Sequence, residues 1–279
     1  MLTTWYTSLV DGLVRRDGDF YKFPKKIAGV SSITEFVKVR GGSFKLGKSE
    51  KNRGLKDLPR HTATLTYDYF IGKYLVTEET FARFNTNFEV TNPYIPITDI
   101  TWFEAIEFCN DISRLNNLPV AYDLFGNLLD KYGKLTTDIT QVVGYRLPTE
   151  TEWEFAATGA VNELNFQFAG GNIIDYVGWY KDNSAQQIHE VGQLQPNTLG
   201  IFDLTGNVNE WCYDSFKYGE VDFYKETTNN IGIEHTNTRI VRGGSWTDPA
   251  QHCTIDYRDY CAADKSYSVL GFRLVRTII

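Results

Sequence analysis

Helix signals in this chain are confined to three short stretches, and each of them begins at a threonine. Thr77 is followed directly by two glutamates, which suits the N-terminus of a helix. Thr101 with Glu104, and Thr149 with Glu152, have the spacing of capping boxes, in which the two residues satisfy each other's backbone N–H groups. Apolar residues follow Thr101 at helical spacing. The rest of the sequence must therefore fold without long helices.

Beyond residue 159 the sequence is rich in glycine, asparagine and aromatic residues. Short β-rich stretches occur at residues 62–69, 239–242 and 272–275. The chain contains 17 Tyr, 18 Phe and 6 Trp. Rings at this density suit a fold with many loops, because each ring buries a large area while fixing few torsions. We predict an α+β fold with short strands, few helices and much irregular chain.

Composition excludes several classes of protein. The net charge of −7 argues against nucleic-acid binding, because phosphates require a basic surface. No stretch approaches about 18 consecutive apolar residues, so no transmembrane segment is predicted. The four cysteines form no C-x-x-C pair, and their disulfide state stays open: Cys109, Cys212, Cys253 and Cys261. Cys109 falls within the second predicted helix and is expected to be a buried hydrophobic residue.

No linker or low-complexity tract divides the 279 residues. Residues 1–33 are interpreted as an irregular lead-in, and residues 34–279 as one domain. The lead-in is expected to pack on this domain through aromatic side chains: Trp5, Tyr6, Phe20, Tyr21 and Phe23. No basic region followed by an apolar run is visible at the N-terminus. The protein is either cytoplasmic or an exported protein whose signal has been removed.

The common catalytic motifs are missing. There is no Walker loop, no H-E-x-x-H and no G-x-S-x-G. The four histidines lie far apart and are expected to be structural or on the surface: His61, His189, His235 and His252. Ser43 and Ser245 each follow two glycines, a pattern that indicates tight backbone turns. Glu150, Glu152 and Glu154 are interpreted as capping and surface charge rather than as catalytic carboxylates.

The segment 203–210 (DLTGNVNE) is a candidate ion site. It places Asp203 and Glu210 on either side of Gly206. A glycine-containing turn can aim backbone carbonyls at an ion, and Ca²⁺ prefers such hard oxygen ligands. An Asx turn followed by an ordinary surface glutamate is the alternative.

Six strings of the sequence, taken in order, resemble the formylglycine-generating enzyme (sulfatase-modifying factor) family over roughly residues 34–276. They are GGSF at 41–44, FIGKY at 70–74, YRLPTETEWE at 145–154, PNTLG with DLTGNVNEW at 196–211, RGGSW at 242–246, and GFRL at 271–274. The resemblance implies a C-type-lectin-like fold with little regular secondary structure. It also implies a calcium site with side-chain oxygens from Asp203 and Glu210 and carbonyls from Gly206 and Val208.

Catalysis in this family, by the same resemblance, uses copper held by two thiolates just after the Gly-Gly-Ser motif. The second thiolate position matches Cys253, whereas the first matches Asp248. Thiolates suit Cu(I) because both are soft, and a carboxylate is a hard donor that cannot replace one in a two-coordinate site. We therefore expect no copper and no enzymatic activity.

Residues 247–269, with the closing segment at 270–273, resemble the variable region of proteins diversified by retroelements, such as the treponemal variable proteins. Such diversification mutates adenines and leaves codons that cannot encode Lys, Glu, Gln, Met or Trp. Residues 247–269 contain only two residues of these five types, Gln251 and Lys265. The frequency of the five types in the whole chain would give about four in a segment of this length. The tyrosines and small polar residues of this tract are also typical of binding surfaces, although a plain surface loop has a similar composition.

The residues expected to contact a ligand all lie in this tract: Thr247, Asp248, Pro249, His252, Asp256, Asp259, Tyr260, Cys261, Ala262, Tyr267, Ser268 and Val269. Cys253 and Arg258 are interpreted as parts of the frame that holds it. The sequence thus predicts a monomeric, non-catalytic protein that binds a protein or glycan ligand, at the cell surface or outside the cell. A copper-dependent formylglycine-generating oxidase and a calcium-dependent carbohydrate-binding lectin are the alternatives.

Overall fold

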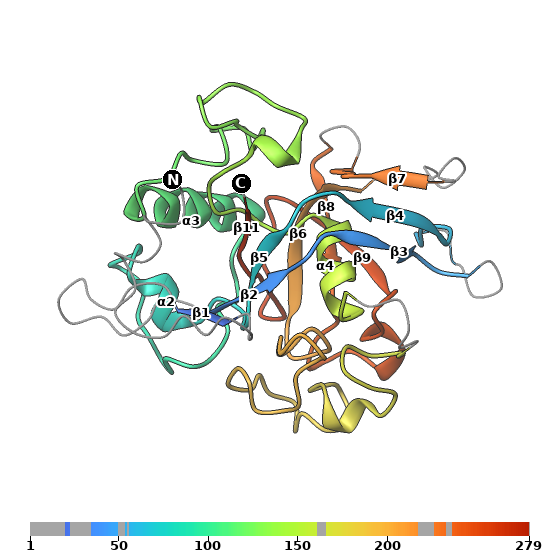
Figure 1. Ribbon diagram of the computed structural model, residues 1–279. Helices are drawn as coiled ribbons and strands as arrows, with labels where there is room; N and C mark the ends of the chain where they lie inside the picture. The colour runs from blue at the N-terminus through green and yellow to red at the C-terminus, as the bar shows by residue number, and fades with distance from the viewer. Residues whose placement is uncertain are drawn as a thin grey trace.

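A computed structural model describes residues 20–22 (backbone only), 35–49, 54, 56–160, 166–216, 226–232 and 236–278. The lead-in predicted for residues 1–33 therefore lies outside the described residues, except for the strand at 20–22. His235 also lies outside them. The strands of the described part form three small sheets, and Figure 1 shows them around a short central helix, with long loops at the periphery.

The first sheet joins the two ends of the described chain. Its order is β1-β2-β5-β11, with every pair antiparallel. The strands are β1 (Phe20–Lys22), β2 (Glu35–Val39), β5 (Tyr69–Gly72) and β11 (Val275–Thr277). All four residues of β5 are buried, because β5 is an inner strand with neighbours on both sides.

The second sheet, in the order β10-β6-β8-β9, contains most of the C-terminal chain. Its strands are β6 (Asn209–Ser215), β8 (Thr238–Arg242), β9 (Arg258–Ala262) and β10 (Leu270–Gly271). β10 pairs with β6 in parallel, whereas the pairs β6–β8 and β8–β9 are antiparallel. β9 is an edge strand of this sheet.

The third sheet, β3-β4-β7, is the most exposed. It consists of β3 (Gly42–Leu46), β4 (His61–Leu65) and β7 (Glu226–Thr228). In β4, buried residues alternate with half-buried ones, as expected for the sequence HTATL with one face on the core.

The three predicted helices are present and begin where the sequence indicates. They are α2 (Glu78–Ala82), α3 (Trp102–Leu115) and α4 (Glu150–Ala157), with N-caps at Thr77, Thr101 and Thr149. Both predicted capping boxes are formed. Three single 3₁₀ turns are also described: Ile139–Gln141, Ile174–Tyr176 and Ala250–His252. The prediction of an α+β fold with few helices is thus confirmed, and in the described chain no helix is long and apolar enough to cross a membrane.

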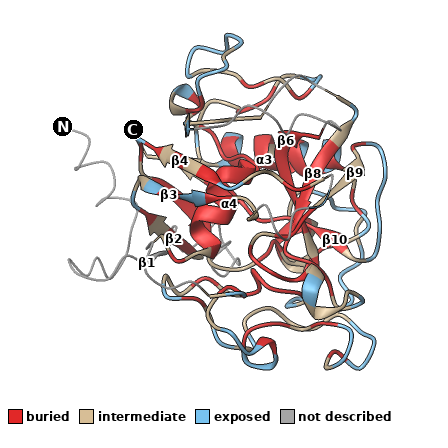
Figure 2. Cartoon of the chain, turned by 90° about the vertical axis from the view of Figure 1, so that its right-hand side faces the viewer, coloured by how far each residue is buried: buried red, intermediate tan, exposed pale blue. Residues whose placement is uncertain are grey.

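The interpretation of the three glutamates of α4 as surface charge was wrong, although Glu152 caps the helix as predicted. All eight of its residues are buried, including Glu150, Glu152 and Glu154. Figure 2 shows α4 and the strands β6 and β8 as mainly buried elements. Three arginines neutralise these carboxylates: Arg146, which lies just before the helix, and Arg242 and Arg258 from distant strands.

Two strand predictions also differ from the structure. The stretch at 62–69 is interrupted, because β4 ends at Leu65 and β5 begins only at Tyr69. Of residues 272–275, only Val275 lies in a strand. Arg273 lies between β10 and β11, and its guanidinium is buried against Glu210. The backbone around Arg273 is therefore positioned by this ion pair and not by pairing with a neighbouring strand. The strand at 239–242 is confirmed as β8.

The two Gly-Gly-Ser segments differ from each other. Ser43, expected in a tight turn, lies within β3 instead. Before Ser245 the prediction is confirmed, since Gly243 and Gly244 have φ values of 95° and 71°. A Cβ on Gly244 would lie 2.6 Å from the Cys253 sulfur, so only glycine fits this position.

Cys109 is completely buried in α3, as predicted, and burial raises the pKa of its thiol. Three tryptophans, Trp102, Trp153 and Trp211, are also fully buried and fill the core between α3, α4 and the second sheet. The indole N–H of Trp102 donates to the Cys212 carbonyl at 3.0 Å. Large rings thus replace long helices as the means of filling the interior.

We expect Arg146→Met to lower the free energy of unfolding by about 3–5 kcal/mol, because it leaves the Glu152 carboxylate buried without its partner. Arg146 Nη1 lies 2.6 Å from Glu152 Oε2, and both side chains are fully buried. Urea denaturation followed by tryptophan fluorescence measures the change. The matched control is Arg114→Met, since Arg114 pairs with Asp111 at the surface and should contribute less than about 1 kcal/mol. Equal effects of the two substitutions would contradict this account of the core.

Candidate functional site

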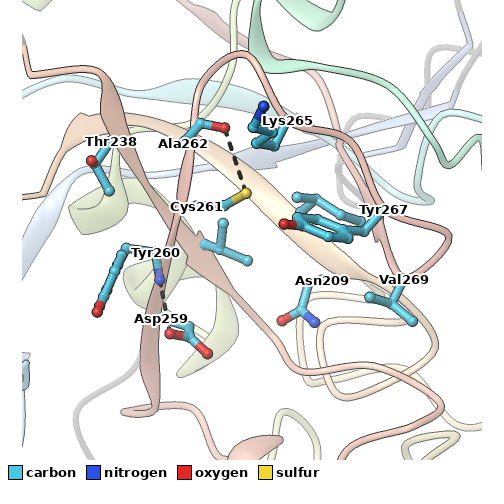
Figure 3. A pocket seen from close by; sticks show the side chains of 11 residues that line it. Asn209, Thr238, Asp259, Tyr260, Cys261, Ala262, Lys265, Tyr267 and Val269 are labelled. Atoms are coloured by element: carbon cyan, nitrogen blue, oxygen red, sulfur yellow. Dashed lines mark hydrogen bonds between the residues drawn. The ribbon is translucent and has the colours of Figure 1, made fainter.

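A cavity of about 390 Å³ lies between β9 and the segment that leads into β10. It is lined by Asn209, Thr238, Val241, Asp259, Tyr260, Cys261, Ala262, Lys265, Tyr267, Val269 and Leu270. Figure 3 shows the Cys261 side chain in the middle of this group, with Tyr267 on one side and Asp259 and Tyr260 on the other. We refer to it as the β9 pocket.

Strand pairing brings the β9 pocket together from parts of the chain far apart in sequence. Asp259 pairs with Val241 and Cys261 with Arg239 across β8 and β9, so the odd-numbered residues of both strands share one face of the sheet. On the other side, Asn209 pairs with Leu270 across β6 and β10. Four strands therefore contribute lining residues, and the backbone of the pocket is held by a sheet.

The base of the β9 pocket is apolar, whereas its rim carries both charges. Val241 and Leu270 are buried beneath it. Lys265 and Tyr267 are largely exposed, with 60% of the Lys265 side chain and 52% of Tyr267 accessible to solvent. Asp259 accepts hydrogen bonds from the Tyr260 backbone N–H at 3.0 Å and from Lys56 Nζ at 3.1 Å. The pocket suits a ligand with an apolar body and polar ends.

Cys261 contributes a thiol rather than a thiolate. Burial, together with the charges of Asp259 and Asp264, raises its pKa to about 11. Its Sγ lies 3.5 Å from the Ala262 carbonyl. At neutral pH the side chain therefore offers a small, weakly polar surface and not a nucleophile.

The structure brings half of the predicted contact residues into the pocket and leaves the rest outside it. Six line the pocket: Asp259, Tyr260, Cys261, Ala262, Tyr267 and Val269. Six lie elsewhere on the tract: Thr247, Asp248, Pro249, His252, Asp256 and Ser268. Five lining residues were missed: Asn209, Thr238, Val241, Lys265 and Leu270. Alternation along residues 239–242 could have pointed to Val241, but no local signal marks Asn209.

The second group packs mainly on itself. His252 stacks on Tyr257 with ring centroids 4.4 Å apart, and its Nδ1 lies 3.7 Å from Asp248 Oδ1. Asp256 accepts a hydrogen bond from the Thr254 hydroxyl at 2.7 Å. Asn209 connects the two groups, because it lines the pocket and donates to Asp248 Oδ2 at 3.3 Å.

The donor set around Asp248 and Cys253 does not fit Cu(I). Asp248 Oδ2 accepts from the Ser245 hydroxyl at 2.6 Å and from the Ser245 backbone N–H at 2.9 Å. Cys253 is fully buried, and burial followed by the charge of Asp248 raises the pKa of its thiol to about 12. A carboxylate held by hydrogen-bond donors and a protonated thiol supply no pair of soft anionic ligands.

The loop at 203–210 does not fit calcium either. Both oxygens of Glu210 accept from the Arg273 guanidinium, at 2.6 and 2.7 Å. An ion bound to Glu210 would lie next to this buried positive charge. Asp203 Oδ2 accepts from the Gly192 backbone N–H at 2.8 Å. Gly206, with φ of 68°, is explained by the close approach of the Trp179 carbonyl, 2.0 Å from where a Cβ would lie.

Val208, the other carbonyl expected to bind calcium, belongs to a fully buried residue. Across the described residues, no group of three or more His, Cys, Asp or Glu side chains is placed to hold a metal ion. All four cysteines are free thiols.

Buried ion pairs from α4 hold the strands that carry the pocket. Glu154 pairs with Arg242 at the end of β8, and Glu150 pairs with Arg258 at the start of β9, with Arg258 Nε 2.8 Å from Glu150 Oε1. Both arginines are less than one tenth exposed. These pairs fix the inner face of β8 and β9 against α4.

The chain is similar to known proteins over most of its length. The family model of the sulfatase-modifying factor enzyme 1-like domain matches residues 23–278. The chaperone protein LppX of Paenibacillus barcinonensis is 32% identical over 277 residues, covering 87% of this chain and 89% of LppX. The mouse formylglycine-generating enzyme is 32% identical over 150 residues, which cover 47% of this chain and 38% of that enzyme.

Among solved structures, Treponema denticola variable protein 1 superposes with a TM-score of 0.76 at 27% identity, covering 93% of this chain and 99% of that one. The two resemblances expected from the sequence, to formylglycine-generating enzymes and to a treponemal variable protein, are both present in these comparisons.

The stability of this frame should depend on pH through Asp214. Asp214 lies in β6, only 2% exposed, and burial followed by the charge of Glu150 raises its pKa from 3.8 to about 7. Between these values the folded protein keeps a proton that the unfolded chain has lost, so the free energy of unfolding falls as the pH rises. Below this window the folded and unfolded states both carry the proton, and above it neither does, so the decrease in the free energy of unfolding is complete.

We expect Asp214→Asn to flatten this dependence and to raise stability above about pH 8 by on the order of 1–3 kcal/mol. The amide oxygen can still accept from the Glu150 backbone N–H, which donates to Asp214 Oδ2 at 2.7 Å. Urea denaturation across the pH range measures the effect. Asp264→Asn, at an exposed side chain, is the control and should leave the profile unchanged. An unaltered slope in Asp214→Asn would mean that another group titrates.

Proposed function

This chain belongs to the sulfatase-modifying factor enzyme 1-like family, and we propose that it is a member that binds a ligand without catalysis. The single observation that carries the proposal is the presence of a carboxylate, that of Asp248, next to the β9 pocket. Asp248 stands where the enzymes of this family have a thiolate, by the resemblance described above, and its carboxylate is bound to Ser245. An open cavity of about 390 Å³ lies beside this position, whose donor atoms do not suit Cu(I).

The ligand contacts are the exposed side chains of residues 247–269 and the lining of the β9 pocket. The tyrosines Tyr260 and Tyr267 are the expected hot spots, because a ring buries a large area at low entropic cost. Lys265, Asn209 and Thr238 add polar contacts to those expected from the sequence. The similarity to Treponema denticola variable protein 1 supports this assignment.

Diversification by a retroelement is part of the proposal. Cys253 and Arg258 are buried, whereas Thr247 and residues 264–268 are exposed, so substitutions at the exposed positions leave the core contacts untouched. A reverse transcriptase gene beside a near-copy of the final coding stretch would support this origin. A lone gene next to a sulfatase gene would contradict it.

The ligand is proposed to be a protein or glycan outside the cell, bound by a monomer. The enzymatic alternative, a copper-dependent formylglycine-generating oxidase, requires thiolates at both positions, and only Cys253 is present. A calcium-dependent lectin requires free oxygen ligands, but Arg273 occupies those of Glu210. Glycan binding that depends on added calcium would favour the lectin.

A pocket-filling substitution tests the binding site directly. We expect fragments with an aromatic ring and a polar end to bind wild-type protein in ligand-observed NMR, and Cys261→Phe to weaken binding at least about tenfold by occupying the cavity. The matched control is Gln187→Phe, since Gln187 is exposed, lies outside residues 247–269 and does not line the pocket. Fragment binding that is equal in the two variants would place the site elsewhere.

A further inference from the structure

The two charged residues that line the β9 pocket differ in how far their charges are neutralised within the protein. Figure 3 shows Lys265 and Asp259 on opposite sides of Cys261. Each end of a cavity with an apolar base thus carries one charged side chain. A ligand in the pocket responds to the charge that remains at each end after internal pairing.

The charge of Asp259 is offset by Lys56, which lies outside the tract at 247–269. Lys56 Nζ lies 3.1 Å from Asp259 Oδ1 and donates to the Tyr257 hydroxyl at 2.8 Å. Burial lowers the pKa of Lys56, but the hydrogen bonds to Tyr257 and Asp259 outweigh this, so the net shift is upward and Lys56 stays charged. The Tyr260 backbone N–H donates to the same carboxylate at 3.0 Å. Little negative charge therefore remains at this end.

The charge of Lys265 is offset much less. Its side chain is 60% exposed, against 29% for Lys56. Lys265 Nζ lies 3.8 Å from Asp264 Oδ2, and an exposed pair at this distance contributes little. Asp99 contacts the same segment through its backbone N–H, which donates to the Tyr267 carbonyl at 3.1 Å, and it does not line the pocket. The Lys265 ammonium group can therefore pair with a ligand.

A further positive charge lies next to the pocket. Arg239 pairs with Cys261 across β8 and β9 and is only 3% exposed. Its Nη1 donates to two uncharged oxygens of β6, at 2.9 and 3.2 Å, and its Nε has no hydrogen-bond partner. Among the described residues, Arg239 forms no ion pair. The carboxyl group of Asp214, whose charge acts on Arg239, has a pKa raised to about 7. Buried charge of this kind favours an anion nearby.

We propose, building on the binding function proposed above, that the β9 pocket takes a carboxylate joined to an apolar body. The carboxylate lies at the Lys265 end, and the apolar body covers Val241 and Leu270. The ligand thereby supplies the negative charge that Lys265 and Arg239 lack. The Asp259 end accepts an uncharged polar group. A free organic acid, or a protein chain that ends in an aromatic residue, has this chemistry.

Three small probes of similar size test the proposal. 4-Hydroxyphenylacetate, 4-hydroxyphenylacetamide and tyramine share a phenol ring, and the group at the other end is negative, neutral or positive. Dissociation constants come from ligand-observed NMR titrations at neutral pH. We expect the acid to bind at least about fivefold more tightly than tyramine, with the amide between them. Added salt should reduce this difference.

Lysine substitutions show which charges set the preference. Lys265→Met should bring the acid and tyramine to within about twofold of each other. Lys56→Met should favour tyramine, because Asp259 then presents an unpaired carboxylate to the probe. The matched control is Lys134→Met, which changes the net charge equally at an exposed residue that does not line the pocket. It should keep the preference of the wild type. Circular dichroism checks that each variant is folded.

A peptide distinguishes the two sources of the carboxylate. N-acetylated Gly-Gly-Tyr with a free C-terminus is compared with its C-terminal amide and with 4-hydroxyphenylacetate. Tighter binding of the free-ended peptide than of the small acid supports a protein chain end as the source, whereas weaker binding supports a free acid. Both results support an anionic ligand, provided that the free-ended peptide binds more tightly than its amide.

The proposal is overturned if tyramine binds as tightly as the acid while Cys261→Phe blocks both probes, because the pocket then binds without preference for negative charge. It is also overturned if Lys265→Met keeps the full preference. If none of the probes binds, or if Cys261→Phe leaves their binding unchanged, the β9 pocket fails as the binding site, and the function proposed above fails with it.

Discussion

Buried pairs of arginine and carboxylate hold this loop-rich protein together. Four arginines, all less than one tenth exposed, bind buried glutamates, and three of the four pairs join residues far apart in sequence: Arg146 with Glu152 (six residues apart), Arg242 with Glu154, Arg258 with Glu150, and Arg273 with Glu210. Three of the glutamates lie on the eight-residue helix α4. A helix this short has little stability of its own, so its place between the sheets depends on these pairs. Each pair gains its strength from the loss of water, and a broken pair is correspondingly costly.

The same pairs fix the backbone beneath the proposed binding surface. Arg242 and Arg258 lie on β8 and β9, with their guanidinium groups directed to α4 on the inner side. Cys253 and Gly244 pack against each other beneath the tract. What remains outside, around the β9 pocket, is an apolar base with a rim of tyrosine, lysine and aspartate.

Local signals in the sequence predicted local structure well. The capping boxes at Thr101 and Thr149 placed α3 and α4, because the bonds of a capping box lie within three residues. The burial of Glu150 and Glu154 could not be read in this way, since their partners lie 108 and 88 residues away. The calcium prediction considered the loop at 203–210 alone and so missed Arg273, 63 residues beyond Glu210.

The candidate site shows the same division between local and distant signals. Residues 259–262 were predicted as contacts because they belong to one continuous tract, and the β9 pocket contains all four. Asn209 and Thr238 enter the pocket only through pairing with β10 and β9, which no local pattern reveals. Lys265 was left out because lysine is not expected at diversified codons, although its position in the tract is exposed. The sequence prediction remains untested as a binding surface, and strand pairing determines which of its residues share the β9 pocket.

The most direct test of the central claim is the oxidation of a substrate cysteine. Purified protein is incubated in air with Cu(I) and a cysteine-containing sulfatase peptide, and the peptide is examined by mass spectrometry for conversion to formylglycine. With a carboxylate at Asp248 and a protonated thiol at Cys253, the account predicts no conversion. It also predicts copper affinity no higher than that of Cys253→Ser. Turnover of the peptide, or tight Cu(I) binding lost in Cys253→Ser, would contradict it.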